Sequence, residues 1–490
     1  MNLKMYVFVT GKVMIILGAL MLIPVITGLI YQEYDNVLVY IITAAFSLIA
    51  GFLMSLKKPS YTKIFLKDSL VITALSWIVM SLIGCIPFIM TGEIPSFTNA
   101  MFETVSGFTT TGASILSNVE GLSHISLLWR SLTHWIGGMG VLVFLLAVVP
   151  MTGGTNMNLM RAESPGPSVG KLVPKVRSTA KALYLIYLAL TIAEIVVLIL
   201  CRMPVFDSLC TAFGTAGTGG FGIKNDSFAS YSPLIQWVVT VFMILFGVNF
   251  NFYYLVITRQ IVKSLKMEEV RAYFLIVIGS AIVIAINIYH IYGNVKDALR
   301  HSFFQVATVI TTTGFATTDF DQWPTLSKCI MVMLMFVGAC AGSTGGGIKV
   351  ARLLMRIKTF TREIDSCIHP NNIKTIQIDG KPVDNDTIRS VNAFCMTFVA
   401  VFSLSLLIIS IEGHDLITSF TAIAATINNI GPGLALVGPT ANYGFFSILS
   451  KWVLIFDMLA GRLELFPLII FLFPGTYKSS LRSKISKLVR

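Results

Sequence analysis

The stretch Thr311-Thr312-Thr313-Gly314-Phe315-Ala316 has a counterpart about two hundred residues earlier, Thr109-Thr110-Thr111-Gly112-Ala113-Ser114. A motif that recurs at such a distance indicates an internal repeat. The likeness extends into the preceding segments, where Glu103 aligns with Gln305. Three β-branched threonines followed by a glycine are unfavourable inside a helix. Each stretch therefore predicts a helix that ends, followed by extended backbone.

The composition is that of a membrane protein. Hydrophobic residues make up 55% of the 490 residues, charged residues make up 12%, and the mean hydropathy is +0.79. A water-soluble globular surface does not tolerate such values. The net charge of +12 does not indicate a nucleic-acid partner, because the basic residues lie in short segments between apolar runs, where they act as orientation signals. The seven cysteines lack C-x-x-C spacing, so neither a metal site nor a disulfide framework is indicated.

Ten apolar runs are long enough to span a bilayer at about 20 residues each. They cover residues 6–30, 37–56, 69–91, 125–150, 182–201, 233–258, 272–292, 326–357, 390–411 and 444–473. Every second connection is basic, which by the positive-inside rule places both termini in the cytoplasm. The longest basic connection contains two alternating runs about Asp379-Gly380, which predict a small β-hairpin. We therefore predict an all-α, multi-pass membrane protein without a soluble domain.

Four non-basic connections each contain a semi-apolar segment that is too short to span, a length typical of re-entrant helices. These segments cover residues 96–109, 206–217, 298–311 and 415–428. Candidate N-caps for them are Ser96, Asp207, Asp297 and Asp415. Each segment ends in a glycine-containing string. Strings 1 to 4 are Thr110-Thr111-Gly112-Ala113-Ser114, Thr218-Gly219-Gly220-Phe221-Gly222, Thr312-Thr313-Gly314-Phe315-Ala316 and Asn429-Ile430-Gly431-Pro432-Gly433.

Four such strings are suited to binding a cation. An unpaired charge in a low-dielectric medium costs tens of kcal/mol, so the protein must replace the hydration shell of the ion. Rings of backbone carbonyls do this, a central glycine lets the carbonyls point inward, and each short helix directs the negative end of its dipole to the same place. The predicted filter residues are Thr110, Thr111, Gly112, Thr218, Gly219, Gly220, Thr312, Thr313, Gly314, Asn429, Ile430 and Gly431. The alternative is that the glycines only permit close helix packing.

The sequence resembles the Trk/Ktr/HKT superfamily of potassium uptake proteins, most closely the TrkH type, over nearly the whole chain. The resemblance implies four tandem helix–pore loop–helix repeats around one pseudo-fourfold pore, plus an N-terminal helix pair. It assigns filter roles to Gly112, Gly220, Gly314 and Gly431 with their neighbours, and it makes potassium the permeant ion bound there. Glycine in string 1, where some sodium-conducting relatives carry serine, favours potassium. Because string 4 contains Pro432 and the strings depart from Thr-Val-Gly-Tyr-Gly, we expect looser selectivity than in a potassium channel.

These repeats predict a division of the chain into five parts. They are the N-terminal helix pair at 1–66, pore repeats at 67–160, 161–262 and 263–365, and a hairpin segment with the fourth repeat at 366–490. The resemblance further implies a homodimer with cytosolic nucleotide-binding regulatory subunits of the TrkA type. It also implies a location in the cell (inner) membrane. We expect no cofactor in this chain.

The eighth apolar run is interrupted by the glycine-rich segment 338–347, through which a helix is unstable because each glycine costs up to about 1 kcal/mol relative to alanine. A Walker A loop does not fit, since Ile348 separates the last glycine from Lys349 and no strand precedes the segment. The resemblance implies an intramembrane gating loop below the filter. It consists of Gly342, Ser343, Thr344, Gly345, Gly346 and Gly347. A passive helix break between packed repeats is the alternative.

Arg462 lies deep inside the last apolar run, where charge is expensive and usually functional. The resemblance implies a pore arginine at this position, competing with the permeant cation. The alternative is a structural ion pair with Glu464 or Asp457. We assign no chemistry to the histidines, and we expect His134 to lie near the outer side.

Two other classes compete with an ion-conducting protein. A sodium- or proton-coupled secondary cation transporter has broken helices and a midplane site, but such proteins usually show two large repeats rather than four short pore loops. An intramembrane enzyme would need a constellation such as H-E-x-x-H, which does not occur. We therefore predict potassium uptake across the membrane and no enzymatic activity.

Overall fold

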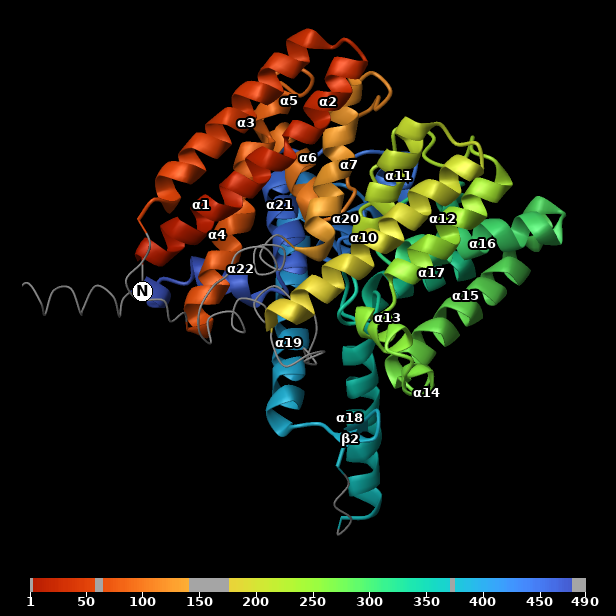
Figure 1. Ribbon diagram of the computed structural model, residues 1–490. Helices are drawn as coiled ribbons and strands as arrows, with labels where there is room; N and C mark the ends of the chain where they lie inside the picture. Colours follow the sequence, from red (N-terminus) through yellow and green to blue (C-terminus); the bar gives the residue numbers. More distant parts are fainter. Residues whose placement is uncertain (1–2, 58–64, 141–175, 371–374, 478–490) are drawn as a thin grey trace, which may run out of the picture.

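The computed structural model describes residues 3–57, 65–140, 176–370 and 375–477, and the chain in these ranges is almost entirely helical (Figure 1). The strands within them are β1 (Gln377–Ile378) and β2 (Lys381–Pro382), which pair antiparallel about Asp379-Gly380. The predicted β-hairpin is thus confirmed. The all-α class is confirmed as well.

The chain begins with a helical hairpin and continues with four groups of helices. The hairpin consists of α1 (Leu3–Leu20), α2 (Leu22–Ile30) and α3 (Tyr34–Ser55). The first group contains α4 (Leu66–Gly84), α5 (Ile86–Met90), α6 (Phe97–Phe108) and α7 (His124–Met139). The second contains α10 (Val176–Leu200), α11 (Val205–Gly217), α12 (Pro233–Phe246), α13 (Phe250–Ile257) and α14 (Ile261–Leu265).

The last two groups repeat the order of long helix, short helix and broken second helix. The third group contains α15 (Glu268–Tyr292), α16 (Val295–Ile310), α17 (Thr325–Val337) and α18 (Val350–Ile368). The fourth contains α19 (Asn385–Ile409), α20 (Leu416–Ile427), α21 (Ile448–Arg462) and α22 (Phe466–Leu472). In Figure 1, α18 extends below the rest of the molecule, with the hairpin strand β2 beside it.

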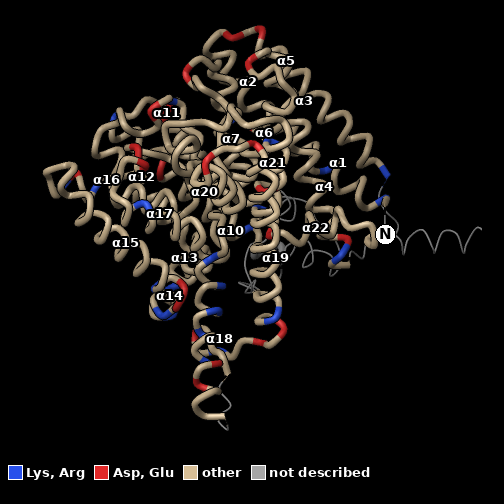
Figure 2. Tube along the Cα trace, turned by 180° about the vertical axis from the view of Figure 1, so that it is seen from behind, with Lys and Arg blue, Asp and Glu red and all other residues tan. Residues whose placement is uncertain are grey.

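Six helices of the described ranges are long and apolar enough to cross a membrane, or seven if the pair α12 and α13 forms one span bent by 90°. The six are Leu3–Ile30, Tyr34–Ser55, Leu66–Met90, Ala180–Leu200, Glu268–Tyr292 and Asn385–Glu412. Figure 2 shows acidic residues in the uppermost loops and groups of charged residues on α14 and α18 at the bottom, with further charged residues between these levels. Large apolar side chains such as Leu275 and Met396 are exposed on long helices, as expected where lipid replaces water. The protein is a multi-pass membrane protein.

The remaining predicted spans are interrupted. Helix α7 ends at Met139, before Gly140, whose φ is +77°, and residues 141–150 of that span lie outside the described ranges. Helix α17 stops before Gly338, and α21 is separated from α22 by residues 463–465, of which Glu464 and Leu465 have positive φ. Three of the four groups therefore have a broken second helix, since α12 and α13 also bend sharply.

The four short helices α6, α11, α16 and α20 begin and end within three residues of the predicted segments. Two of the predicted N-caps are wrong. Pro204 precedes α11, and the carboxylate of Asp207 accepts a hydrogen bond from Tyr231. Asn294 caps α16, and Asp297 instead forms an ion pair with Arg300.

Asp415 is the N-cap of α20 and accepts a hydrogen bond from the Thr418 N–H at 3.0 Å, as predicted. Ser96 occupies the N-cap position of α6 but makes no such bond. We expect Asp415→Ala to destabilise the protein by about 1 kcal/mol, because an N–H of the first turn loses its acceptor. Ser96→Ala is the matched control and should have a smaller effect on the thermal unfolding midpoint in detergent. Equal shifts in the two variants would contradict this assignment.

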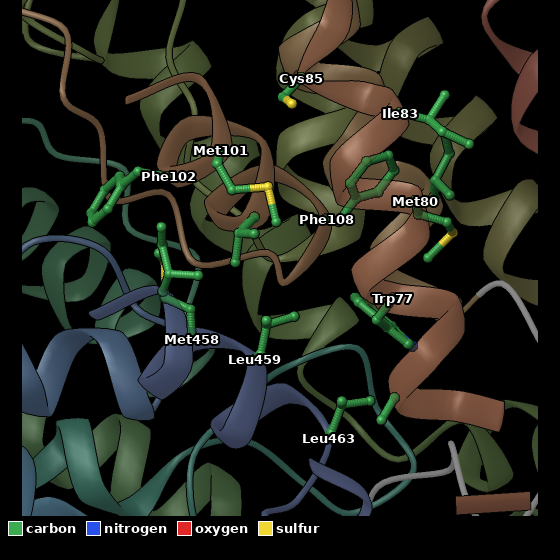
Figure 3. Packing of buried hydrophobic residues seen from close by; sticks show 14 of the residues in the cluster. Trp77, Met80, Ile83, Cys85, Met101, Phe102, Phe108, Met458, Leu459 and Leu463 are labelled. Carbon is green, nitrogen blue, oxygen red and sulfur yellow. The ribbon is translucent and has the colours of Figure 1, made fainter. Parts of the chain in front are cut away.

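Contacts between successive groups close a ring. Helix α7 packs against α11, α12 against α16, and α17 against α20. The ring closes where α21 of the last group packs against α6 of the first. Figure 3 shows this contact, with Met458 and Leu459 of α21 near Met101 of α6 and Trp77 of α4. The four short helices are therefore held in one circle.

Candidate functional site

The four strings share one backbone conformation. Their first residues, Thr110, Thr218, Thr312 and Asn429, have φ between +55° and +59°. Two positions later, Gly112, Gly220, Gly314 and Gly431 have φ between +76° and +95°. Residues that carry a side chain rarely adopt a φ of this size, so the backbone requires glycine at these four positions. The shared geometry extends to string 4 although its sequence differs most.

The central glycines bring the strings into contact around a closed circle. A Cβ atom on Gly112 would collide with the carbonyl of Gly219, one on Gly220 with Thr313, and one on Gly314 with Ile430. On Gly431 it would lie 2.6 Å from the carbonyl oxygen of Thr111, and the other three distances are shorter still. Each glycine thus faces the carbonyl that precedes the glycine of the next string. The structure therefore brings all twelve predicted filter residues to one place.

The four short helices end directly before these strings. Their C-caps are Thr109, Thr218, Thr311 and Asn428. The carbonyl ends of helices carry partial negative charge, so this place favours a cation.

Side chains behind the strings hold the backbone in this conformation. The hydroxyls of Thr109 and Thr111 lie 2.8 Å apart, and those of Thr311 and Thr313 lie 2.7 Å apart. The amide of Asn429 donates to the Thr111 hydroxyl at 2.9 Å, which ties string 4 to string 1. The hydroxyl oxygen of Thr110 is buried and has no hydrogen-bond partner among the described residues.

A cavity of about 130 Å³ opens beyond the glycines. All four central glycines line it, together with Arg130 and other residues that follow the strings in the sequence. The cavity therefore lies on one side of the circle of strings, and the first residues of the strings lie on the other side.

The predicted helix break at 338–347 is confirmed and extends to Lys349, because α17 ends at Val337 and α18 begins at Val350. This glycine loop, 338–349, packs against the beginnings of strings 3 and 4. The N–H of Gly346 donates to the hydroxyl of Thr312 at 2.6 Å. A Cβ atom on Gly345 would lie 2.9 Å from the carbonyl oxygen of Thr311, and one on Gly346 would collide with that of Asn428. The loop therefore lies against the side of the circle opposite the cavity.

The loop is also held from the side of α12 and α13. The Cys340 N–H donates to Gly247 at 3.1 Å, and the Phe250 N–H donates to Gly342 at 3.0 Å. The carboxylate of Glu269, at the beginning of α15, accepts from the Ala341 N–H at 2.5 Å and from the Asn249 amide at 3.1 Å. Sequence reasoning missed Glu269, since its partners are 20 and 72 residues away.

Arg462 connects three parts of the ring. Its guanidinium donates to the carbonyl of Thr344 in the loop at 2.8 Å and to those of Gly137 and Gly138 in α7 at 2.5 and 2.8 Å. Glu464 forms an ion pair with Arg352, and Asp457 accepts from Ser405.

Three buried residues that sequence reasoning left without a role lie beside strings 1 and 2. Glu103 of α6 and Arg130 of α7 form an ion pair at 2.7 Å, with side chains 1% and 2% exposed. The ring of His134 contacts the backbone of α6 and of string 2. Its Nδ1 lies 2.8 Å from the Gly107 carbonyl oxygen, and its Nε2 lies 3.1 Å from the Phe221 nitrogen. The i, i+4 spacing of Arg130 and His134 on one helix face was the signal available in the sequence.

Known proteins resemble this chain over nearly its whole length. The sequence pattern of the TrkH family, described as a cation transport protein, matches residues 35–476. The Trk system potassium uptake protein TrkH of Salmonella typhimurium (strain LT2) is 32% identical over 488 residues, covering 98% of this chain and 100% of that protein. The Trk system potassium uptake protein TrkG of Escherichia coli (strain K12) is 35% identical over 463 residues, covering 93% and 95%.

A solved structure has the same fold. The crystal structure of the potassium transporter TrkH from Vibrio parahaemolyticus superposes with a TM-score of 0.87 at 31% identity, covering 97% of this chain and 99% of that one. The family match includes all four strings, the glycine loop and Arg462. These relatives are transporters and not enzymes. The chain belongs to the TrkH family of cation transport proteins.

Proposed function

We propose that the protein takes up potassium through a single pore whose selectivity filter is the circle formed by strings 1 to 4. The observation that carries this proposal is the cyclic contact of each central glycine with the carbonyl of the next string. Carbonyl oxygens arranged in rings replace the hydration shell of a cation. The potassium uptake proteins and the potassium transporter to which the chain is similar support potassium as the ion.

In this proposal the cavity beyond the glycines is the outer entrance, and the glycine loop is the gate at the inner end. The contact of Gly346 with Thr312 obstructs passage from the filter. Arg462 holds the loop closed through the Thr344 carbonyl, and its charge opposes a cation at this position. Opening requires the loop to leave strings 3 and 4.

Purified protein in liposomes tests the transport function. We expect an inward potassium flux driven by the potassium gradient alone. A sodium- or proton-coupled cation transporter is the alternative, and it predicts that potassium accumulates only when a sodium or proton gradient is imposed. Absence of potassium flux under both conditions would contradict the proposal.

We place both termini and the β-hairpin in the cytoplasm, on the side of the basic connections. The parts 1–66, 67–160, 161–262, 263–365 and 366–490 are the proposed helix pair, three repeats, and hairpin with fourth repeat. We further propose that the protein forms a homodimer and binds TrkA-type nucleotide-binding subunits on its cytoplasmic face. The protruding α18 and the hairpin beside it offer a surface for such subunits (Figure 1).

Two consecutive carboxylates connect this surface with the loop. The backbone N–H of Glu268 donates to the Asp379 carboxylate at 2.7 Å, and the Asp379 N–H donates to the Glu268 carboxylate at 3.2 Å. Glu268 also pairs with Lys358 of α18. The next residue, Glu269, holds the loop at Ala341. Movement of the hairpin is thereby transmitted to the gate through the beginning of α15.

We expect Asp379→Ala to weaken the response of flux to the regulatory subunits without changing flux in their absence, because the carboxylate that accepts from the Glu268 N–H is lost while the contact of Glu269 with the loop is kept. Glu269→Gln should raise flux without subunits, since Ala341 loses its charged acceptor. Potassium flux is measured in liposomes with and without the regulatory subunits recovered by pull-down from membranes. The comparison distinguishes the two effects. If pull-downs from membranes recover no soluble partner with the hairpin intact, the docking proposal fails.

A further inference from the structure

Two buried side chains of α7 contact Phe221, the residue that follows the central glycine of string 2. The guanidinium carbon of Arg130 lies 3.9 Å from the centroid of the Phe221 ring, and the ring of His134 lies 4.3 Å from the same centroid. String 2 therefore packs against a helix that belongs to the first group. Strings 1 and 2 meet here, since Gly112 faces the carbonyl of Gly219.

The Glu103–Arg130 pair connects the outer ends of both strings. The carboxylate of Glu103 accepts from the Ser114 hydroxyl and the Ile115 N–H, both at 3.0 Å. Arg130 donates to the same carboxylate at 2.8 Å and to the carbonyl of Gly222 at 3.2 Å. A planar guanidinium with several donors makes these bonds simultaneously, which an ammonium group does not reproduce.

His134 holds string 2 one helical turn further along α7. Its Nδ1 lies 2.8 Å from the Gly107 carbonyl, which can only accept, and its Nε2 lies 3.1 Å from the Phe221 N–H, which can only donate. These partners assign a neutral imidazole with its hydrogen on Nδ1. Cβ atoms on Gly217 or Gly219 would collide with His134, so the string lies directly on this residue.

Strings 3 and 4 are held differently. Gln305, which aligns with Glu103, donates to the Thr318 carbonyl at 3.1 Å. In string 4, the hydroxyl of Tyr443 donates to the Gly431 carbonyl at 2.6 Å. Among ion pairs of the described residues, Glu103–Arg130 is the one with both side chains no more than 2% exposed. Its burial beside the strings distinguishes it from the surface pairs.

We infer that Glu103, Arg130 and His134 are positioning residues for ion selectivity. They hold the backbone carbonyls of string 2 in place against string 1, and the position of these carbonyls determines which ion is selected. This inference rests on the proposed filter. The pair also neutralises the charge of Arg130, which lines the outer cavity through which the cation enters. Loss of either partner leaves one buried charge uncompensated at that entrance.

The test is the ratio of potassium to sodium flux measured in the same proteoliposomes, which does not depend on the amount of folded protein. We expect Arg130→Gln and His134→Asn to lower the ratio about tenfold, the effect of losing a hydrogen bond to a charged or buried group. Arg130→Lys should lower the ratio by less, because it keeps the charge. Arg300→Gln, which removes the partly exposed pair with Asp297 on α16, is the matched control and should leave the ratio unchanged.

Glu103→Gln should reduce potassium flux more at low than at high ionic strength, because it exposes the entering cation to the uncompensated Arg130. Unchanged ratios in Arg130→Gln and His134→Asn would overturn the inference if Gly220→Ser alters the ratio in the same assay. Unchanged ratios in all three variants would instead overturn the proposed filter.

Discussion

Gly112→Ser and Gly314→Ser are expected to lower the selectivity for potassium over sodium at least about tenfold, which corresponds to about 1.4 kcal/mol of differential stabilisation. Each glycine has a positive φ, and a Cβ atom at either position would collide with a carbonyl of the next string. The substitution therefore displaces one of the carbonyls that form the proposed filter. The measurement is the ratio of the two ion fluxes in proteoliposomes.

Gly92→Ser is a matched control for these variants. Gly92 has the same φ as Gly112, +76°, but no atom within 4 Å would meet its Cβ. Gly92→Ser therefore reproduces the backbone strain without displacing a carbonyl. The ratio of potassium to sodium flux in this variant should equal that of the parent protein. Unchanged ratios in both filter variants would remove Gly112 and Gly314 from the filter.

Deletion of Ser343, Thr344, Gly345 and Gly346 is expected to raise basal potassium flux about tenfold or more, if the open state of the parent is populated at about 10% or less. The deletion removes the bond from Gly346 to Thr312 and the carbonyl that binds Arg462. Regulation by cytosolic subunits should be blunted, because the loop no longer connects Glu269 with the strings.

Flux per folded protein separates the gate from its alternative. A passive helix break predicts a lower yield of folded protein and no increase in flux. A deletion variant that folds normally, and conducts and responds as the parent does, would place the gate elsewhere. Arg462→Ala would then be the next variant to measure.

The elements that depend on local backbone preferences were predictable from the sequence. The ends of α6, α11, α16 and α20 follow from threonine, asparagine and glycine, which are unfavourable in helices, and the hairpin follows from Asp379-Gly380. The break after Val337 follows from the glycine cluster in the same way. Each of these signals lies within a few residues of the structure that it determines.

Contacts between distant residues were not predictable. Asp207 and Asp297 have the side chains of N-caps, but Tyr231 and Arg300 engage them instead. His134 reads as an isolated histidine, and only the packing of α7 against α11 brings it to Phe221. A single sequence shows which side chains are able to form hydrogen bonds or ion pairs. Which of them become partners depends on how the helices pack.

The most direct test of the filter is anomalous diffraction from crystals in which rubidium replaces potassium. We predict anomalous density on the axis of the circle, equidistant from the carbonyl oxygens of Thr111, Gly219, Thr313 and Ile430, and weaker density there in Gly112→Ser. Rubidium density that lies away from these carbonyls, in protein that still transports rubidium in liposomes, would contradict the account.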